Sequence, residues 1–201
     1  TITLKDSASN AGKITYTNIG VNASSGTISA EYSASDKVEI NFTIADGYYL
    51  AALNVKVGEA AAVDAINPVE YGYTFDDSNR TGSISVPRTA DVMVTPVVRA
   101  VSAPKITVNN ASVIWNEGDK AASVAVTDET SAAETGTVTY QWYKTLSASA
   151  EGTAVTDAMG ESYEISTEKL DVEKNGFVET FYYYCVATNT KNGSKAQTKS
   201  D

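Results

Sequence analysis

Histidine is absent from this 201-residue chain, and cysteine occurs only once. Without an imidazole, the chain has no Ser-His-Asp or Cys-His pair for nucleophilic catalysis and no His-ligated metal. A catalytic thiol needs a histidine or another cation to activate it, so we expect Cys185 to be a buried, small apolar residue. With a single cysteine no intrachain disulfide can form. These absences predict a protein with no catalytic residues, no metal and no cofactor.

Three further chemistries remain open from the residue types alone. Paired carboxylates catalyse glycoside hydrolysis, but the acidic residues here fall in turns and on strand exteriors, so we expect no enzyme. Asp76-Asp77-Ser78-Asn79 offers oxygen ligands for Ca²⁺ but lacks the glycine and terminal glutamate of an EF-hand, which favours a polar hairpin tip. A Lys–Asn isopeptide crosslink would need its partners buried together. We expect no core position for any of the candidates, which are Lys105, Lys120, Asn189 and Asn192.

Long apolar runs and basic stripes are also missing. No stretch of 18 apolar residues occurs, so we expect no membrane insertion. The net charge of −10 is dispersed: residues 1–101 carry 7 basic and 11 acidic side chains, and residues 102–201 carry 8 and 14. Neither half can neutralise a phosphate backbone, so nucleic acid is not an expected partner. The chain begins at Thr1 without methionine, which suggests a trimmed or mature fragment of a larger protein, and we expect a monomer.

The residues that are abundant favour strands. Valine, isoleucine, threonine and tyrosine recur with a period of two, the pattern of a half-buried strand. A joint of small residues with Pro104, between Arg99 and Lys105, separates two strand-rich stretches. We therefore predict an all-β chain of two tandem β-domains, 1–101 and 102–201. Because the joint is only about five residues long, with a reach of about 17 Å, we expect the two domains to meet end to end.

The second half has the spacing of a seven- or eight-stranded sandwich. Strands are expected over 105–108, 122–127, 138–142, 153–156, 163–165, 181–187 and 195–199. Alternation places Trp142, Tyr183 and Cys185 in the core, with Leu170 as an apolar plug before the strand that contains Cys185. Trp115 is either a core residue or an apolar contact near the joint.

The first half also alternates with a period of two. Strands are expected over 13–17, 27–32, 38–44, 53–57, 71–75, 82–86 and 92–98, with a tight turn at Asp46-Gly47-Tyr48. Residues 59–66 are rich in alanine, the best helix former, and are followed by Pro68. They predict either one or two helical turns or an insertion loop.

A Trp in one strand and Tyr-x-Cys in a later one are the core signature of immunoglobulin-like domains. Residues 103–201 resemble a bacterial Ig-like domain of the kind found in arrays on Firmicutes surface proteins. The residues that carry the resemblance are Tyr140-Gln141-Trp142-Tyr143-Lys144, Ser162-Tyr163-Glu164-Ile165 and Tyr182-Tyr183-Tyr184-Cys185-Val186-Ala187-Thr188-Asn189. The first cysteine of an antibody-type bridge is missing, so the resemblance implies a sandwich without a disulfide. In these domains the Tyr two residues before the Cys makes a corner hydrogen bond, which would be Tyr183 here.

Residues 1–101 resemble the divergent B-type repeats of bacterial surface proteins. The resemblance rests on the strand Val38 to Ile44, the turn Asp46-Gly47-Tyr48-Tyr49-Leu50 and the strands Leu53 to Val57 and Asp91 to Pro96. Both resemblances imply a non-catalytic extracellular structural or adhesion module, a stalk or spacer, within a larger cell-surface or secreted protein.

One set of side chains remains a candidate binding site. By alternation with Trp142 and Cys185, the residues Tyr143, Tyr182 and Tyr184 point outward from the sheet. Exposed tyrosines suit stacking on a sugar or contact with a protein. Cross-strand tyrosine pairs that only stabilise the sheet are the simpler interpretation. The alternative function is therefore a carbohydrate-binding accessory domain of a secreted glycan-processing enzyme, with a host or environmental glycan or protein as partner.

Overall fold

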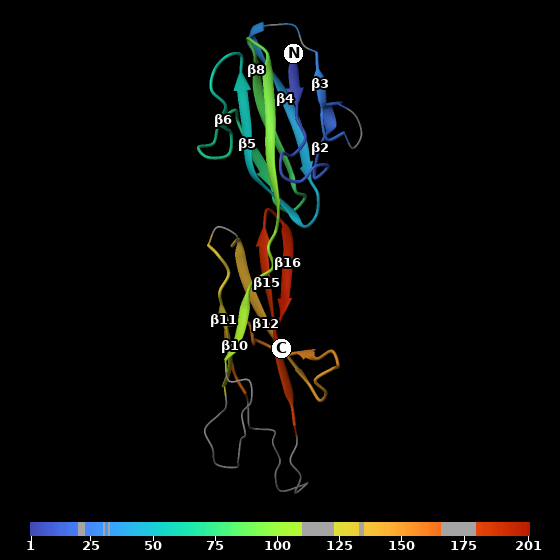
Figure 1. Ribbon diagram of the computed structural model, residues 1–201, viewed down its shortest axis with the longest axis vertical. Coiled ribbons are helices and arrows are strands. Elements are labelled where there is room, and N and C mark those ends of the chain that lie inside the picture. The colour runs from blue at the N-terminus through green and yellow to red at the C-terminus, as the bar shows by residue number, and fades with distance from the viewer. Residues whose placement is uncertain (20–22, 30, 32, 110–122, 133–134, 166–179) are drawn as a thin grey trace, which may run out of the picture. The chain divides into compact units, whose positions relative to one another are not determined.

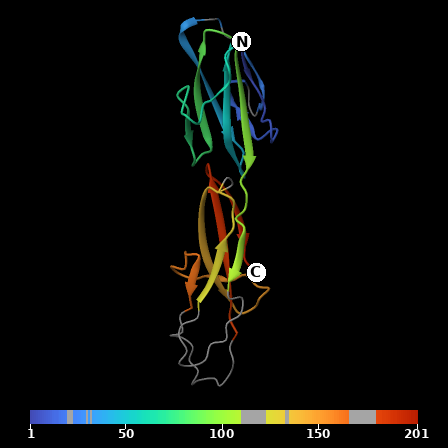
Figure 2. The same ribbon diagram turned by 60° about the vertical axis from the view of Figure 1, so that its left-hand side comes forward.

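The computed structural model describes residues 1–19, 23–29, 31, 33–109, 123–132, 135–165 and 180–201. The chain divides into two compact units, Thr1–Val101 with Lys191–Lys195 and Ser102–Thr190 with Ala196–Asp201, which we call unit 1 and unit 2. Both are built from β-strands (Figures 1 and 2), and the prediction of an all-β chain is confirmed. Among the described residues, no helix has the length and apolar character needed to cross a membrane.

Unit 1 is a sandwich of two sheets. Its described elements are β1 (Ile2–Leu4), β2 (Ile14–Tyr16), the 3-10 helix η1 (Thr17–Ile19), β3 (Gly26–Ile28), β4 (Ser33–Ile44), β5 (Tyr48–Val57), β6 (Val63–Asp64), β7 (Thr74–Asp76), β8 (Thr81–Arg88) and β9 (Val92–Ala100). One sheet has the order β3-β1-β9-β5-β6 and the other the order β2-β4-β8-β7. Alternating residues of both sheets pack into one core, whose buried members include Leu4, Tyr16, Ile40, Phe42, Leu53, Val55, Ile84 and Val94.

The first and last strands of unit 1 are parallel neighbours. Ile2 lies opposite Val92 and Leu4 opposite Val94, while the other edge of β1 pairs with β3 in antiparallel fashion. The backbone N–H of Val92 donates to the carbonyl of Thr1, and the N–H of Lys5 donates to the carbonyl of Val94, each over 2.9 Å. The beginning and the end of this unit are therefore joined by a ladder of hydrogen bonds.

Two expectations for unit 1 are settled by the structure. Of the helical turns or insertion loop predicted over residues 59–66, the structure shows the loop, in which Val63 and Asp64 make the short strand β6 against β5. The Asp64 carboxylate holds this strand in place because it accepts bonds from the N–H groups of Leu53 and Ile66. The strand expected over 71–75 begins only at Thr74, since Tyr71 and Gly72 have φ angles of 53° and 61° and form a turn. Positive φ takes the backbone out of the extended conformation that a ladder requires.

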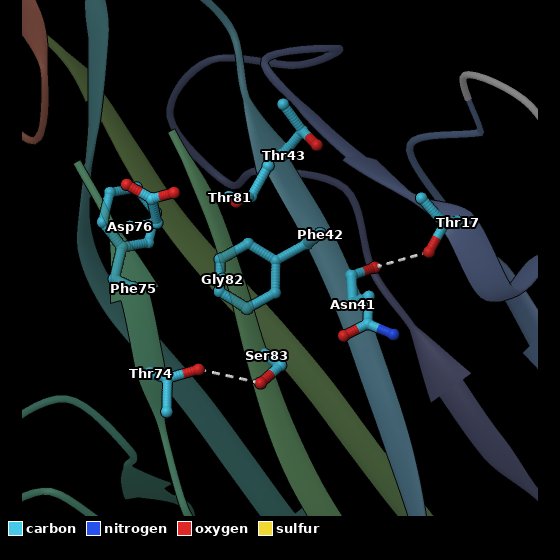
Figure 3. Close-up of a pocket in the computed structure, with 10 residues that line it drawn as sticks. All are labelled: Thr17, Asn41, Phe42, Thr43, Thr74, Phe75, Asp76, Thr81, Gly82 and Ser83. Carbon is cyan, nitrogen blue, oxygen red and sulfur yellow. Dashed lines mark hydrogen bonds between the residues drawn. The ribbon is translucent and has the colours of Figure 1, made fainter. Parts of the chain in front are cut away.

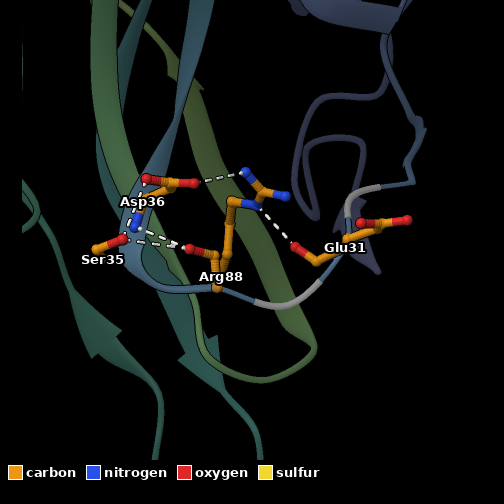
Figure 4. Close-up of polar contacts among 5 residues, drawn as sticks. Glu31, Ser35, Asp36 and Arg88 are labelled. Atoms are coloured by element: carbon orange, nitrogen blue, oxygen red, sulfur yellow. Dashed lines mark hydrogen bonds and ion pairs between the residues drawn. The ribbon is translucent and has the colours of Figure 1, made fainter.

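A bulge interrupts the pairing of β4 with β8. The register shifts between Ser33, which pairs with Arg88, and Lys37, which pairs with Pro87. Figure 4 shows how Arg88 holds this segment: its Nε donates to the carbonyl of Glu31 over 2.8 Å, and its guanidinium lies 3.3 Å from the Asp36 carboxylate. One side chain therefore fixes both sides of the bulge.

Unit 2 is a second sandwich, and its described strands lie close to the predicted ones. They are β10 (Ile106–Asn109), β11 (Ser123–Asp128), β12 (Thr137–Thr145), β13 (Thr153–Ala154), β14 (Ser162–Glu164), β15 (Tyr182–Lys191) and β16 (Ser194–Lys199). The sheets have the orders β10-β11-β14 and β13-β12-β15-β16. These correspond to the A-B-E and C′-C-F-G sheets of an immunoglobulin sandwich.

The core of unit 2 confirms the Ig-like prediction. Trp142 of β12 lies directly opposite Cys185 of β15, and both side chains are buried together with Val126 and Ala158. The indole Nε1 of Trp142 donates to the carbonyl of Gly160 over 2.9 Å, so the buried ring has its polar partner. Tyr183 is only half-buried, and it packs at the edge of this cluster. Cys185 is a free thiol, so the sandwich has no disulfide.

Several predictions fall on residues that the structure does not describe. Trp115, Lys120 and Leu170 lie outside the described residues, so their predicted roles stay predictions. The corner bond expected of Tyr183 needs an acceptor a few residues upstream, and residues 166–179 also lie outside the described part.

Candidate functional site

The three predicted binding tyrosines lie on the outer face of the β13-β12-β15-β16 sheet. Tyr143 of β12 lies opposite Tyr184 of β15, and Tyr182 lies opposite Thr145 two positions along the same pair of strands. Side chains alternate between faces along a strand, so these residues point away from the face that carries Trp142 and Cys185. We call Tyr143, Tyr182 and Tyr184 the tyrosine face.

Two of these rings are packed against each other. The rings of Tyr143 and Tyr184 are 5.0 Å apart between centroids and 5° from parallel. Lys199 of β16, the strand on the other side of β15, places its Nζ 3.9 Å from the centroid of the Tyr184 ring. The Tyr184 hydroxyl accepts a hydrogen bond of 3.0 Å from the N–H of Gly152. Tyr184 is therefore held on both sides and at its tip.

The remaining aromatic surface belongs to the other two residues. Tyr182 is 42% exposed, and Tyr143 has Ala154 as its register partner on the side opposite Tyr184. A sugar ring stacks on an aromatic face that is not fully covered, and Tyr143 is half-buried with a small residue as its neighbour in β13. The geometry shows the cross-strand tyrosine pair and leaves Tyr143 and Tyr182 as the surface that a ligand would meet.

A second feature lies on the outer face of the β2-β4-β8-β7 sheet in unit 1. A recess of about 450 Å³ opens there between two rows of short polar side chains (Figure 3). Asn41, Ser83 and Thr74 form one row across β4, β8 and β7, and Thr43, Thr81 and Asp76 form the other. Between them, the backbone of Phe42, Gly82 and Phe75 makes the floor. We call this recess, which Thr17 also lines, the hydroxyl trough.

A tyrosine links the two sheets of unit 2 through carboxylates. The hydroxyl of Tyr140 in β12 lies 3.1 Å from Oδ2 of Asp128 and 3.2 Å from Oε1 of Glu161. Asp128 is the last residue of β11, and Glu161 immediately precedes β14, so both belong to the other sheet of unit 2. Burial raises the pKa of Tyr140, and the two carboxylates raise it further. Burial also acts to raise the pKa of Asp128, but hydrogen bonds from Thr130 and Tyr140 outweigh it and hold that pKa below its usual value. This cluster serves to join strands.

Cys185 has the surroundings of a structural thiol. Its side chain is fully buried, and burial raises its pKa to about 11. A thiol with such a pKa stays protonated at neutral pH, whereas catalytic cysteines have lowered pKa values. The expectation that Cys185 is an apolar core residue agrees with this environment.

The acidic hairpin between β7 and β8 is organised by its own hydrogen bonds. Asp76 accepts from the N–H of Ser78 over 2.9 Å and from the side-chain amide of Asn79 over 2.7 Å. The side-chain bond from Asn79, followed by the backbone bond from Ser78, lowers the pKa of Asp76. The described residues contain no cluster of three or more Cys, Asp or Glu side chains placed to hold a metal ion.

The expectation that none of the crosslink candidates occupies a core position was wrong for Asn189, which is fully buried. Its carbonyl oxygen accepts from the N–H of Gly136 over 2.7 Å, and its amide donates to the carbonyl of Ser102 over 2.9 Å. The sequence pattern did not reveal this buried amide in β15, because hydrophobic periodicity assigns a polar residue such as asparagine to the surface. Lys105 is exposed, so the two groups do not share a buried site.

The sequence and the structure were compared with protein families, curated proteins and solved structures. No protein-family model matches the sequence, and no curated protein matches it. Among solved structures, the crystal structure of domains A168-A170 from titin is similar over 84% of this chain, at 11% sequence identity and a TM-score of 0.31. The match covers 57% of that titin chain. The Ig-like description of unit 2 therefore rests on its strand order and its Trp142–Cys185 core.

Proposed function

We propose that this chain is a non-catalytic spacer or adhesion arm of a larger bacterial cell-surface or secreted protein, and that unit 1 resists tension applied through its ends. The observation that carries the proposal is the parallel pairing of β1 with β9. Unit 1 resembles the divergent B-type repeats and unit 2 the Ig-like domains of such proteins. An extracellular location is part of the proposal.

The direction of the two strands decides how they meet a pulling force. Tension along the chain draws β1 by its N-terminal end and β9 by its C-terminal end. Because β1 and β9 run in the same direction, these forces act along the ladder in opposite senses and shear all of its hydrogen bonds together. A pair pulled from the same end opens one bond at a time. Shear is therefore the more resistant geometry.

The same strand offers the comparison that tests this. β5 is antiparallel to β9, with Tyr48 opposite Ala100, so handles at the Asp46-Gly47 turn and after Val101 pull that pair from one end. Handles before Thr1 and after Val101 instead shear β1 against β9. In single-molecule force spectroscopy of the whole chain, we expect a higher unfolding force for unit 1 in the second arrangement. Equal forces in the two arrangements would contradict the proposal.

A second candidate function is glycan binding at the tyrosine face, as an accessory domain of a secreted enzyme. The observation that favours it is the 42% exposure of Tyr182 beside Tyr143, whose register partner in β13 is the small residue Ala154. A glycan array with the purified chain tests it. A signal that disappears when Tyr143, Tyr182 and Tyr184 are all replaced by alanine in a folded protein supports this function, and a blank array rejects it.

A further inference from the structure

We propose that the hydroxyl trough of unit 1 binds an uncharged, polyhydroxylated ligand, a short neutral oligosaccharide. The trough lies on the β2-β4-β8-β7 sheet and shares no residue with the tyrosine face. This proposed binding site does not depend on the proposal that unit 1 resists tension.

The trough offers hydrogen-bonding groups that the protein itself does not use. The side-chain amide of Asn41 and the hydroxyls of Thr43 and Thr81 make no hydrogen bond to another described residue. By contrast, Thr74 and Ser83 bond each other over 2.9 Å, and the Thr17 hydroxyl donates to the carbonyl of Asn41 over 3.5 Å. Figure 3 shows these side chains on neighbouring strands around the floor at Gly82. Unused donors and acceptors that converge on a recess are what a polar ligand needs for orientation.

The chemistry of the lining selects the ligand class. No lysine or arginine lines the trough, so a phosphate or sulfate group would find no counter-charge. Asp76 is the single carboxylate of the lining, and it already accepts bonds from Ser78 and Asn79, so the trough offers a cation little negative charge. The side chains of the walls are threonine, serine, asparagine and aspartate, so a purely apolar ligand would cover their polar groups without giving them a partner. Hydroxyls and amides together match a molecule that both donates and accepts at many points.

The shape of the trough suits a chain of sugar rings. The floor crosses β4, β8 and β7, a width of about 10 Å at the usual strand spacing. β4 and β8 have a strand on both sides, so a peptide could add as a further strand only beside β7, at the edge of the sheet, and not across the floor. Gly82 keeps the floor flat, because the Phe42 ring packs across it on the core side. The volume of about 450 Å³ lies in the usual range for small-molecule sites.

The test is a titration of the ¹⁵N-labelled whole chain with neutral tetrasaccharides of glucose, xylose, galactose and N-acetylglucosamine. We expect at least one of them to shift the amide signals of residues 41–43, 74–76 and 81–83. Asn41→Ala and Thr81→Val should each weaken that binding about tenfold, the usual effect of one lost hydrogen bond to a ligand. Thr95→Val, on the outer face of the other sheet of unit 1, is the matched control and should leave the affinity unchanged.

Each result decides the proposal. Thermal melting of the variants first shows that they fold, as surface Thr→Val changes on a strand should. Shifts confined to the trough and lost in both variants support it. Absence of shifts with all four sugars at millimolar concentration overturns it, and so do shifts at Tyr143, Tyr182 and Tyr184 alone. Neither outcome depends on the unfolding force of unit 1, so the two proposals fail or survive separately.

Discussion

Tyr143 and Tyr184 lie face to face across β12 and β15, with their ring centroids 5.0 Å apart. An aromatic pair at directly opposed positions stabilises a sheet by more than the sum of its two side chains. In a double-mutant cycle with Tyr143→Ala and Tyr184→Ala, we expect a coupling of about 0.5–1.5 kcal/mol in the free energy of unfolding, measured with urea. A coupling near zero would show that the rings are neighbours without interaction.

Trp142 is the largest buried side chain of the chain's described part, and its replacement should be costly. Trp142→Ala is expected to lower the stability of unit 2 by about 3–5 kcal/mol, because it leaves a cavity opposite Cys185. Trp142→Phe keeps most of the ring and should cost less, with the loss of the indole bond to Gly160 as its main defect. Chemical unfolding followed by circular dichroism distinguishes the two variants. Equal losses in both would place the importance of Trp142 in its hydrogen bond.

Gly82 is required by its neighbours, although its strand would otherwise favour a larger residue. A Cβ at this position would lie 2.5 Å from Cζ of Phe42 and 2.8 Å from the carbonyl oxygen of Thr74. We expect Gly82→Ala to destabilise unit 1 by about 1–3 kcal/mol. Phe42→Leu in the same chain should recover part of the loss, because the phenyl ring is the movable obstacle. Thermal unfolding of the single and double variants measures this, and no recovery would point to the Thr74 backbone.

The lowered pKa of Asp128 predicts that unit 2 loses stability in acid. The folded chain holds the pKa of this carboxyl below its ordinary value, so its ionised form stabilises unit 2 at pH values above the unfolded pKa. That contribution disappears as the pH falls through the folded pKa. Tyr140→Phe removes one of the bonds responsible, so between about pH 5 and pH 3 its stability should fall less than that of the wild type.

The control for this pH dependence is Tyr143→Phe. It removes a hydroxyl from the opposite face of β12 and should keep the wild-type dependence. Urea unfolding at a series of pH values measures all three proteins. Parallel curves for the wild type and Tyr140→Phe would mean that Tyr140 does not control the titration of Asp128.

Much of unit 2 could be predicted because apolar and polar residues alternate along its strands. Trp142 and Cys185 lie in long strands with this period of two, so the residues next to them in sequence must lie on the outer face of the sheet. The same reasoning missed Ala158, a small residue in a turn that packs on Trp142, since nothing in its local pattern marks it as buried.

The remaining features depend on which strands become neighbours. Alternation says which way Asn41, Thr74 and Thr81 point, but only the pairing of β4, β8 and β7 brings them to one trough. Likewise, Asp128 and Glu161 meet at Tyr140 because strands distant in sequence pack together. Tyr71 was misassigned for a local reason: positive φ in a tyrosine has no signal in hydrophobic periodicity.

The unpaired Cys185 has a consequence for how this protein reaches its native state. Unit 2 needs no oxidising enzyme to fold, because its two sheets are joined by side-chain packing and hydrogen bonds and not by a disulfide. A chain with one thiol cannot form a wrong internal disulfide, so refolding from denaturant should be insensitive to reductant. Two copies of the chain can join by a disulfide between their Cys185 residues, and each thiol must leave the core before this bond can form. The rate at which the disulfide-linked dimer forms in an oxidising buffer would therefore measure how often unit 2 unfolds far enough to expose Cys185.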